Sequence, residues 1–292
     1  MRISEALANT RPFFSFEFFP PKDEAGSRQL FAAIEQLLPL RPAFVSITYG
    51  AGGSSRARTV ALAKQIQQEI GLTVMAHVTC VGSTRAELRV LFDDLARAGV
   101  QNVLALRGDP PKGASDFQVP AGGFAYASEL IAMLKQNYNF CIGAACYPEG
   151  HPQSPSLADD MAHLKEKVEA GAEFLVSQLF FDNDVWAAFV KRARAANIRV
   201  PMLPGLMPIT NSDQIARFTK MCGASIPPKL LHELELRRGE EHAVEDLGVA
   251  YAVLQATQLL GRGASGVHFY TLNRSPATRA IVSALIAGSA WR

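Results

Sequence analysis

The sequence predicts an α/β fold, a single (β/α)8 TIM barrel, and three observations lead to this prediction. The chain has 292 residues, an ordinary length for one such barrel. Eight short apolar segments alternate with longer amphipathic segments, as expected when each strand is followed by a helix. The apolar segments are rich in Val, Ile, Phe and Ala, which is typical of parallel strands covered on both faces. No Pro-, Gly- or Ser-rich linker divides the chain, so residues 1–292 are expected to form one domain.

Each apolar segment defines one expected strand. The strands are expected at residues 13–19, 43–48, 73–79, 102–106, 140–146, 173–178, 199–203 and 266–270. Helices are indicated by apolar residues at helical spacing. They are expected at about residues 30–38, 55–70, 84–98, 125–136, 156–170, 183–196, 212–221, 244–260 and 276–286. Because there are eight strands and every connection contains a helix, a closed barrel is favoured over an open sheet.

Several expected helices carry signals at their ends. Thr84 is followed three residues later by Glu87, which is the pattern of a capping box. Gly99 and Gly171 stand where glycine commonly ends a helix, and Pro276 stands in the first turn of the last helix. These signals support the boundaries of three of the expected helices.

Composition excludes several classes of protein. The chain has 29 basic and 27 acidic residues, and a net charge of +2 is too even for nucleic acid or a membrane surface as the main partner. The N-terminus lacks the apolar region of a signal peptide, and no apolar run approaches the ~20 residues of a membrane span. A cytoplasmic location is therefore expected. Four cysteines form no CxxC pair and are expected to be reduced thiols: Cys80, Cys141, Cys146 and Cys222.

Polar and aromatic residues gather at the carboxyl ends of nearly all the expected strands, which is where the active site of such a barrel lies. Glu17 is the sharpest candidate, because it lies within FSFEFF. Desolvation among aromatic residues disfavours the charged form of a carboxyl group, and this suits a general acid. The alternative is an outward-facing Glu17 paired with a Lys on a covering helix, and the sequence favours neither. His77 taken alone is more often a hydrogen-bonded core histidine than a catalyst.

Two glycine-containing segments are candidates for binding phosphate. Residues 50–55 (GAGGSS) lack the third glycine and the later acidic residue of a dinucleotide fingerprint, but their position suits a phosphate-facing loop. Arg107-Gly108-Asp109 follows the fourth strand, where Arg suits a diphosphate and Gly lets a ligand approach the backbone. No HExxH motif or paired Cys indicates a metal site, and Glu240-Glu241-His242 is expected to be solvated surface.

Segments at the strand ends together resemble one family. They are FSFEFFPPK (14–22), SITYGAGG (46–53), AHVTC (76–80), ALRGDPP (105–111), YPEGHP (147–152), QLFFD (178–182), PGLMPITN (204–211) and HFYTLNR (268–274). In order and spacing, from about residue 12 to about residue 287, they resemble the bacterial type of methylenetetrahydrofolate reductase. No single segment is specific, but FEFFPPK, RGD, YPEGHP and FYTLNR in combination are highly specific.

The resemblance implies a barrel that binds FAD noncovalently without a Rossmann domain. It implies a ping-pong reduction of 5,10-methylenetetrahydrofolate to 5-methyltetrahydrofolate by NADH or NADPH, which supplies methyl groups for methionine synthesis. It also implies a homo-oligomer, either a dimer or a tetramer. The sequence shows no S-adenosylmethionine-binding regulatory domain, so inhibition by that ligand is not expected.

The resemblance also implies roles for individual residues. Glu17 matches the general acid, while Asp109 and Gln178 match the residues that accept hydrogen bonds from the pterin. Asp109 is also implied in catalysis, close enough to the flavin to influence its potential. The remaining substrate-binding residues implied are Gln214, Phe218 (stacking), Tyr270 and Arg274 (glutamate tail). Those implied for FAD are Thr48, Ala51, His77, Arg107, Gly108, Asp109, Tyr126, Ala127, Tyr147, His151, Asp160 and Lys167, with Arg107 and Lys167 at the diphosphate.

Three alternatives stay open on the sequence. The barrel can take electrons from another flavoprotein, a ferredoxin or a deazaflavin. A different FAD barrel such as proline dehydrogenase is less favoured, because Glu17, Asp109 and Gln178 suit a pterin better than an amino acid. A folate- or flavin-binding subunit without turnover is disfavoured by the same three residues. Residues 112–123 look longer than in compact members of the family, which suggests a lid or a reshaped mouth beside Asp109.

Overall fold

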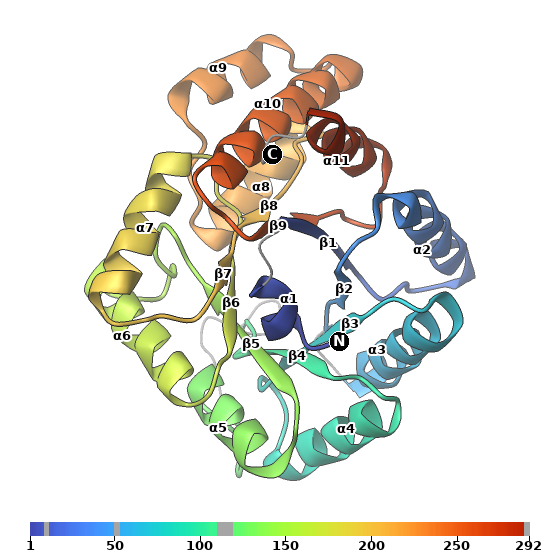
Figure 1. Ribbon diagram of the computed structural model, residues 1–292, viewed down its shortest axis with the longest axis vertical. Helices are drawn as coiled ribbons and strands as arrows, with labels where there is room; N and C mark the ends of the chain where they lie inside the picture. The colour runs from blue at the N-terminus through green and yellow to red at the C-terminus, as the bar shows by residue number, and fades with distance from the viewer. Residues whose placement is uncertain (9–11, 50–52, 110–118, 289–292) are drawn as a thin grey trace.

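The computed structural model describes residues 1–8, 12–49, 53–109 and 119–288 (Figure 1). Within these residues, nine parallel strands form a sheet that curls into a nearly closed barrel, in the order β7-β6-β5-β4-β3-β2-β1-β9-β8. The strands are β1 Phe13–Phe18, β2 Phe44–Ile47, β3 Val74–Thr79, β4 Asn102–Leu106, β5 Cys141–Cys146, β6 Phe174–Ser177, β7 Met202–Leu203, β8 Gly205–Leu206 and β9 Gly266–Tyr270. The predicted TIM barrel is confirmed.

The seventh predicted strand, at residues 199–203, is wrong in extent, and the count of eight strands is also wrong. Two short strands, β7 and β8, lie on either side of Pro204. Because proline has no N–H to donate, it interrupts the ladder at this point. β7 pairs with β6, whereas β8 pairs with β9. The interrupted segment therefore supplies both edges of the sheet and joins them through one residue.

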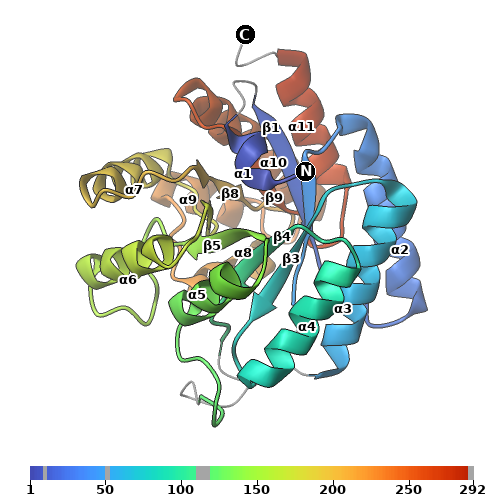
Figure 2. The same cartoon turned by 60° about the horizontal axis from the view of Figure 1, so that its bottom comes forward.

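Helices surround the strands on the outside of the barrel (Figure 2). They are α2 Glu24–Leu37, α3 Gly53–Gln65, α4 Arg85–Arg97, α5 Ala127–Asn137, α6 Leu157–Glu169, α7 Asn183–Ala195, α8 Ser212–Cys222, α10 Glu241–Gly261 and α11 Pro276–Gly288. All nine correspond to predicted helices. Two further helices, α1 Ile3–Leu7 and α9 Pro228–Leu236, were not predicted. α1 has only five residues, too few to show helical periodicity.

The predicted helix ends are confirmed where local side chains define them. The Thr84 hydroxyl accepts from the Glu87 backbone N–H at 3.3 Å, and the Glu87 carboxylate accepts from the Thr84 N–H at 2.8 Å. Gly99 follows α4 with a φ of +79°, in the left-handed region that glycine adopts without strain. α11 begins at Pro276, as expected.

Two apolar cores lie on opposite sides of the sheet. The outer core lies between strands and helices and includes Phe16 and Phe18 of β1. The inner core lies within the barrel and includes Ile3 and Leu7 of α1, which Figure 1 shows across the middle of the barrel. The strand residues of the inner core are Phe13, Phe44, Met75, Leu104, Leu106, Cys141, Phe174, Val176 and Leu203. α1 therefore closes one mouth of the barrel with apolar side chains.

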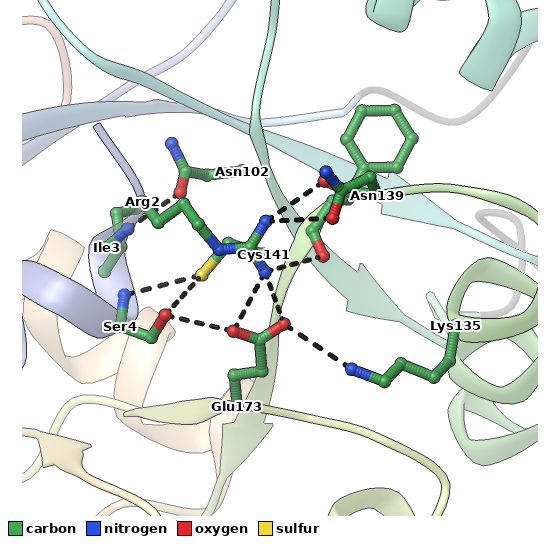
Figure 3. A network of polar contacts seen from close by, with 9 residues as sticks. Arg2, Ile3, Ser4, Asn102, Lys135, Asn139, Cys141 and Glu173 are labelled. Atoms are coloured by element: carbon green, nitrogen blue, oxygen red, sulfur yellow. Dashed lines mark hydrogen bonds and ion pairs between the residues drawn. The ribbon is translucent and has the colours of Figure 1, made fainter.

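A polar network fastens α1 to this mouth (Figure 3). Arg2 donates to the Glu173 carboxylate at 2.8 and 3.1 Å, and Ser4 donates to the same carboxylate at 3.0 Å. Asn102, which is buried at the start of β4, accepts from the Ile3 N–H at 2.8 Å and donates to the Met1 carbonyl at 3.0 Å. The Asn102 oxygen thereby satisfies the Ile3 N–H, one of the N–H groups at the start of α1 that have no partner within the helix.

Replacing Asn102 with Ala should lower the free energy of unfolding by about 1–3 kcal/mol, because it leaves buried backbone groups of α1 without partners. Urea denaturation measures the change. Asn139→Ala is the matched control, since Asn139 is exposed and its side chain makes only a long hydrogen bond, 3.4 Å, with Arg2. Equal effects of the two substitutions would contradict the role assigned to Asn102.

Candidate active site

Glu17 lies inside the barrel at the carboxyl end of β1. Glu17 is 7% exposed. Because side chains alternate between the two faces of a strand, Ser15 lies on the same inner face. Oε2 of Glu17 is 3.5 Å from Nε2 of His77 on β3 and 3.7 Å from Nε2 of His268 on β9. The outward-facing alternative for Glu17 is therefore excluded. A carboxyl group from β1 meets two imidazole rings from two other strands.

The loop after β9 holds the end of β1. The Thr271 hydroxyl donates to the Glu17 carbonyl at 2.6 Å. The Asn273 side chain accepts from the Phe19 N–H at 2.7 Å and donates to the Phe19 carbonyl at 2.9 Å. Leu272 and Asn273 have φ of 53° and 57°, a conformation that is strained for non-glycine residues and that these contacts hold in place. The loop thus fixes the backbone that directly follows the carboxylic acid.

His77 is buried, and its environment keeps the ring neutral. Burial lowers the pKa of His77 to about 4, with Glu17 opposing the decrease and His268 adding to it. Its Nε2 has no hydrogen-bond partner among the described residues, and the same holds for Oγ1 of Thr79, two positions further along β3. Two buried polar atoms without partners on one strand face mark a place where a ligand can supply the partner. Thr79 lies within the AHVTC segment, but the sequence assigned it no role of its own, although its spacing of two from His77 indicates the same face.

His268 was also missed as an individual site residue. It is fully buried, its Nδ1 lies 2.8 Å from the Ser15 hydroxyl, and its Nε2 lies 3.3 Å from the Ser46 hydroxyl. A signal was present in the sequence, since His268 and Tyr270 are two residues apart and share a strand face. Tyr270 donates its hydroxyl proton to the Ser177 carbonyl at the end of β6.

A second cluster lies at the ends of β4 and β5 and on α6. Lys167 of α6 donates to the Ala145 carbonyl at 2.7 Å, and its Nζ lies 5.9 Å from the centre of the Tyr147 ring. The Tyr147 and His151 rings meet edge to face at 4.6 Å. Arg107 donates to the Gln153 side chain. The cluster places the cations Arg107 and Lys167 near the partly buried rings of Tyr147 and His151.

The pKa shifts in this cluster follow from burial and from neighbouring charges. Burial lowers the pKa of Lys167, with Asp160 among the groups that oppose the decrease. Burial and then the Arg107 cation lower the pKa of His151, while Asp160 and Asp109 raise it. Burial raises the pKa of Tyr147 above its ordinary range, and the carboxylates of Asp109 and Asp160 add to the increase. The structure therefore brings these predicted cofactor residues into one electrostatic neighbourhood.

The other predicted cofactor residues lie on further elements or outside the described part of the chain. Thr48 extends β2, where its N–H donates to the Phe18 carbonyl at 2.9 Å. Tyr126 is exposed immediately before α5, which begins at Ala127, and its ring stacks on His163 at 5.8 Å. Asp109 is exposed at the end of the described β4 loop. Ala51 and most of residues 112–123 lie outside the described residues.

Gly108 has a local structural reason to be glycine. Its φ is +87°, and an added Cβ would lie 2.9 Å from the Thr79 Cβ and closer still to Val81. The tight packing of the β4 loop against the β3 end therefore requires glycine, independently of the ligand approach that the sequence suggested.

The other predicted substrate residues lie on three separate parts of the fold: the end of β6, helix α8 and the turn after β9. Gln178 follows β6 and is partly buried, and its side-chain oxygen accepts from the Leu179 N–H at 2.8 Å. Gln214 and Phe218 are partly buried on α8, one turn apart, as predicted. Arg274 is exposed in the turn after β9, where its N–H donates to the Thr271 carbonyl at 2.9 Å.

α8 is held in place from two directions. Ile215 packs into an apolar cluster with Leu179 of the β6 loop and Leu230 of α9. Beyond the end of α8, the Ser225 N–H and hydroxyl donate to the Glu149 carboxylate, the N–H at 3.0 and 3.1 Å. Glu149 belongs to the same loop as Tyr147 and His151. Helix α8, which carries Phe218, is thus linked to the loop after β5, which carries the predicted cofactor residues Tyr147 and His151.

The described residues give no sign of a metal centre or a membrane span. In this part of the chain no group of three or more His, Cys, Asp and Glu side chains is placed to hold a metal ion. None of the described helices has the length and apolar character needed to cross a membrane.

Comparison with known proteins gives matches over nearly the whole chain. A family model described as methylenetetrahydrofolate reductase matches residues 2–286. The chain is 39% identical over 283 residues to methylenetetrahydrofolate reductase (NADH) 1 of Arabidopsis thaliana, covering 93% of this chain and 48% of the relative. It is 36% identical over 271 residues to 5,10-methylenetetrahydrofolate reductase of Escherichia coli (strain K12), covering 93% and 90%. The chain therefore spans about half the length of its plant relative and most of the bacterial one.

A solved structure is similar in fold. An uncharacterized protein from Clostridium thermocellum, described as binding two copies of 5-methyl-5,6,7,8-tetrahydrofolic acid, matches with a TM-score of 0.66 and 15% identity over 99% of both chains. At this identity the likeness shows a shared fold.

Replacing His77 with Gln should reduce the acid sensitivity of the fold. The unfolded chain takes up a proton at this imidazole below about pH 6.5, whereas the folded protein does so only near pH 4. The unfolded state therefore binds more protons between these pH values, and stability falls as the pH is lowered. At about pH 5 this amounts to roughly 2 kcal/mol in the wild type. Denaturation at about pH 7.5 and pH 5 measures the loss, with exposed His232→Gln as the control. An unchanged loss in His77→Gln would contradict the buried neutral ring.

Proposed function

The chain belongs to the methylenetetrahydrofolate reductase family, and we propose that it reduces 5,10-methylenetetrahydrofolate to 5-methyltetrahydrofolate. The proposed cofactor is FAD and the reaction is ping-pong, with the product supplying methyl groups for methionine synthesis. NADH is the donor to test first, because the name of the Arabidopsis thaliana relative specifies NADH. The observation that carries the proposal is Glu17, a buried carboxyl group that meets two imidazoles at the carboxyl ends of the strands.

The described residues fit an FAD. Arg107 and Lys167 provide two cations, both near His151, for a diphosphate, and Tyr147 provides an aromatic ring beside Lys167. Nε2 of His77 and Oγ1 of Thr79 are buried polar atoms that a ring with donors and acceptors can satisfy. When bound, FAD would supply a carrier for the hydride that passes from the nicotinamide to the folate.

Glu17 would supply the proton of the folate half-reaction. The methylene carbon of the substrate bridges two nitrogens, and protonation of one nitrogen opens the ring to an iminium cation that accepts hydride. The carboxyl group is suited to this step because it is buried inside the barrel, away from bulk water. The contacts of Thr271 and Asn273 hold its strand end in place, so the acid keeps one position relative to the bound substrate.

The pterin and the rest of the folate would be held by groups on separate elements. Asp109 and Gln178 carry oxygens that can accept from the amino group and ring N–H of the pterin. Gln178 would have to exchange its bond to the Leu179 N–H for the pterin donor, or accept both. Phe218 on α8 offers a face for stacking on the aminobenzoyl ring or the nicotinamide. Exposed Arg274 suits the acidic glutamate tail.

An anaerobic stopped-flow experiment on the purified protein loaded with FAD tests the function. NADH should bleach the visible flavin absorbance, and subsequent methylenetetrahydrofolate should restore it. A protein that binds no FAD would contradict the proposed cofactor. Bleaching without recovery would contradict the folate as acceptor.

Replacing Glu17 with Gln should leave FAD bound and NADH oxidation largely intact, while folate reduction falls by at least about 100-fold. The reason is that only the folate half-reaction needs the acid, and general acids contribute about 10²–10⁴-fold. The two half-reactions are followed separately by flavin absorbance. Glu35→Gln, on the exposed face of α2, is the control. Survival of folate turnover in Glu17→Gln would remove Glu17 from the role of acid.

Replacing Asp109 with Asn should weaken folate binding by roughly tenfold and alter the rate of flavin reduction. An amide retains one acceptor oxygen but loses the charge that favours the pterin donors and that lies near the flavin. The folate dissociation constant and both half-reaction rates are measured, with Asp246→Asn on the exposed surface of α10 as the control. Unchanged values in both half-reactions would place Asp109 outside the site.

A further inference from the structure

His268 is held tightly in the barrel interior below Glu17. Its ring stacks on Phe44 at 5.8 Å with an interplanar angle of 15°, and it meets the edge of Tyr270 at 5.4 Å. No part of the residue is exposed. Burying an imidazole is costly unless its nitrogens are satisfied, and here Ser15 and Ser46 lie beside Nδ1 and Nε2.

The two ring nitrogens have different surroundings. Nδ1 lies 2.8 Å from the Ser15 hydroxyl, its hydrogen-bond partner among the described residues. Nε2 lies near two groups, the Ser46 hydroxyl at 3.3 Å and Oε2 of Glu17 at 3.7 Å. The titratable groups facing the Glu17 carboxyl group are His77 of β3, and His268 and Tyr270 of β9. Tyr270 is engaged with the Ser177 carbonyl, and Nε2 of His77 has no hydrogen-bond partner among the described residues.

The position of the ring proton decides what His268 does to Glu17. A neutral imidazole has one N–H donor and one acceptor nitrogen. If Nδ1–H donates to the Ser15 hydroxyl, Nε2 presents a lone pair toward the Ser46 hydroxyl at 3.3 Å and Oε2 of Glu17 at 3.7 Å. A small approach of the protonated acid then lets Nε2 accept its hydrogen bond. An ionised carboxylate would instead face that lone pair without a donor. This arrangement therefore favours the form of Glu17 that carries the proton for the substrate.

We propose that His268 is a positioning residue for the acid: its neutral ring, held by Ser15 at Nδ1, presents Nε2 to Glu17 and keeps the carboxyl group protonated and oriented for folate. This inference rests on the proposed function. In the folate step the O–H bond of Glu17 breaks and an N–H bond forms on the substrate. Solvent returns a proton to Glu17 before the next turnover. His268 neither gains nor loses a proton.

Two substitutions separate the two ring nitrogens. The amide of Asn in His268→Asn reaches the position of Nδ1 and retains the contact with Ser15, but it leaves Glu17 without its partner. The longer amide of Gln in His268→Gln reaches the position of Nε2 and can present an oxygen to Glu17. The holoenzyme of each variant is tested in both half-reactions across pH, beside the wild type.

His268→Asn should slow folate reduction by about tenfold or more, with a far smaller change in flavin reduction by NADH. The rate of folate reduction falls as pH rises and the acid loses its proton. In His268→Asn this fall should begin about one pH unit lower, since the acid form has lost its acceptor. His268→Gln should recover most of the rate and the wild-type pH profile. Equal losses in both half-reactions, or an unchanged pH profile in His268→Asn, would overturn the proposal and leave His268 a packing residue.

A second readout does not depend on turnover. In long-range 1H–15N spectra of the histidine rings, the His268 signals, identified by their loss in His268→Gln, should show the proton on Nδ1. Ser15→Ala should weaken that preference. A wild-type ring with its proton on Nε2, or a doubly protonated ring at neutral pH, would refute the proposal even if His268→Asn failed to fold. Wild-type protein that does not reduce the folate would instead refute the proposed function, and the spectra would still decide the state of His268.

Discussion

The interior of a parallel barrel is filled by every second residue of its strands, and this constraint decides where polar chemistry is placed. At one end these positions are apolar, and α1 seals them with Ile3 and Leu7. At the other end they hold Glu17, His77 and His268. The apolar side chains at the α1 end of the barrel keep water from reaching the Glu17 carboxyl group through that end. Ligands therefore approach it from the carboxyl ends of the strands, where the loops offer cations, aromatic rings and amides.

Closure of the barrel brings distant strands into the same site. Pro204 lies between β7 and β8, which pair with β6 and β9 at the two edges of the sheet. Gly205 allows β6 and β9 to approach each other, because a Cβ at this position would collide with the Ser177 carbonyl and the Tyr270 ring. Tyr270 then reaches across to Ser177, the residue before Gln178, while its backbone lies opposite Glu17 in the β1–β9 register. One tyrosine thus lies between the proposed acid and a proposed pterin contact.

The site divides its charges between two regions with different tasks. The cations Arg107 and Lys167 lie toward β4, β5 and α6, where burial strengthens their attraction for an anion but also disfavours charge on Lys167. The proposed acid lies toward β1, β3 and β9, where the pKa of His77 is lowered to about 4 and the ring is neutral. A neutral imidazole beside the carboxyl group avoids an ion pair that would hold Glu17 ionised. In the proposed reaction, the first region would bind an anionic group and the second would move a proton.

The sequence by itself determined the features that depend on neighbouring residues. β4 and β9 were predicted with their observed bounds, and the Thr84–Glu87 capping box was recognised, because period-two alternation and capping are local. The strand-end motifs likewise indicated Glu17 and the family. Only the tertiary structure decided that Glu17 faces inward, that the seventh strand is divided at Pro204, and that α1 closes the barrel. The contact between His268 and Ser15 joins residues 253 positions apart. This contact forms because β1 pairs with β9 when the barrel closes, and no local pattern in the sequence specifies that pairing.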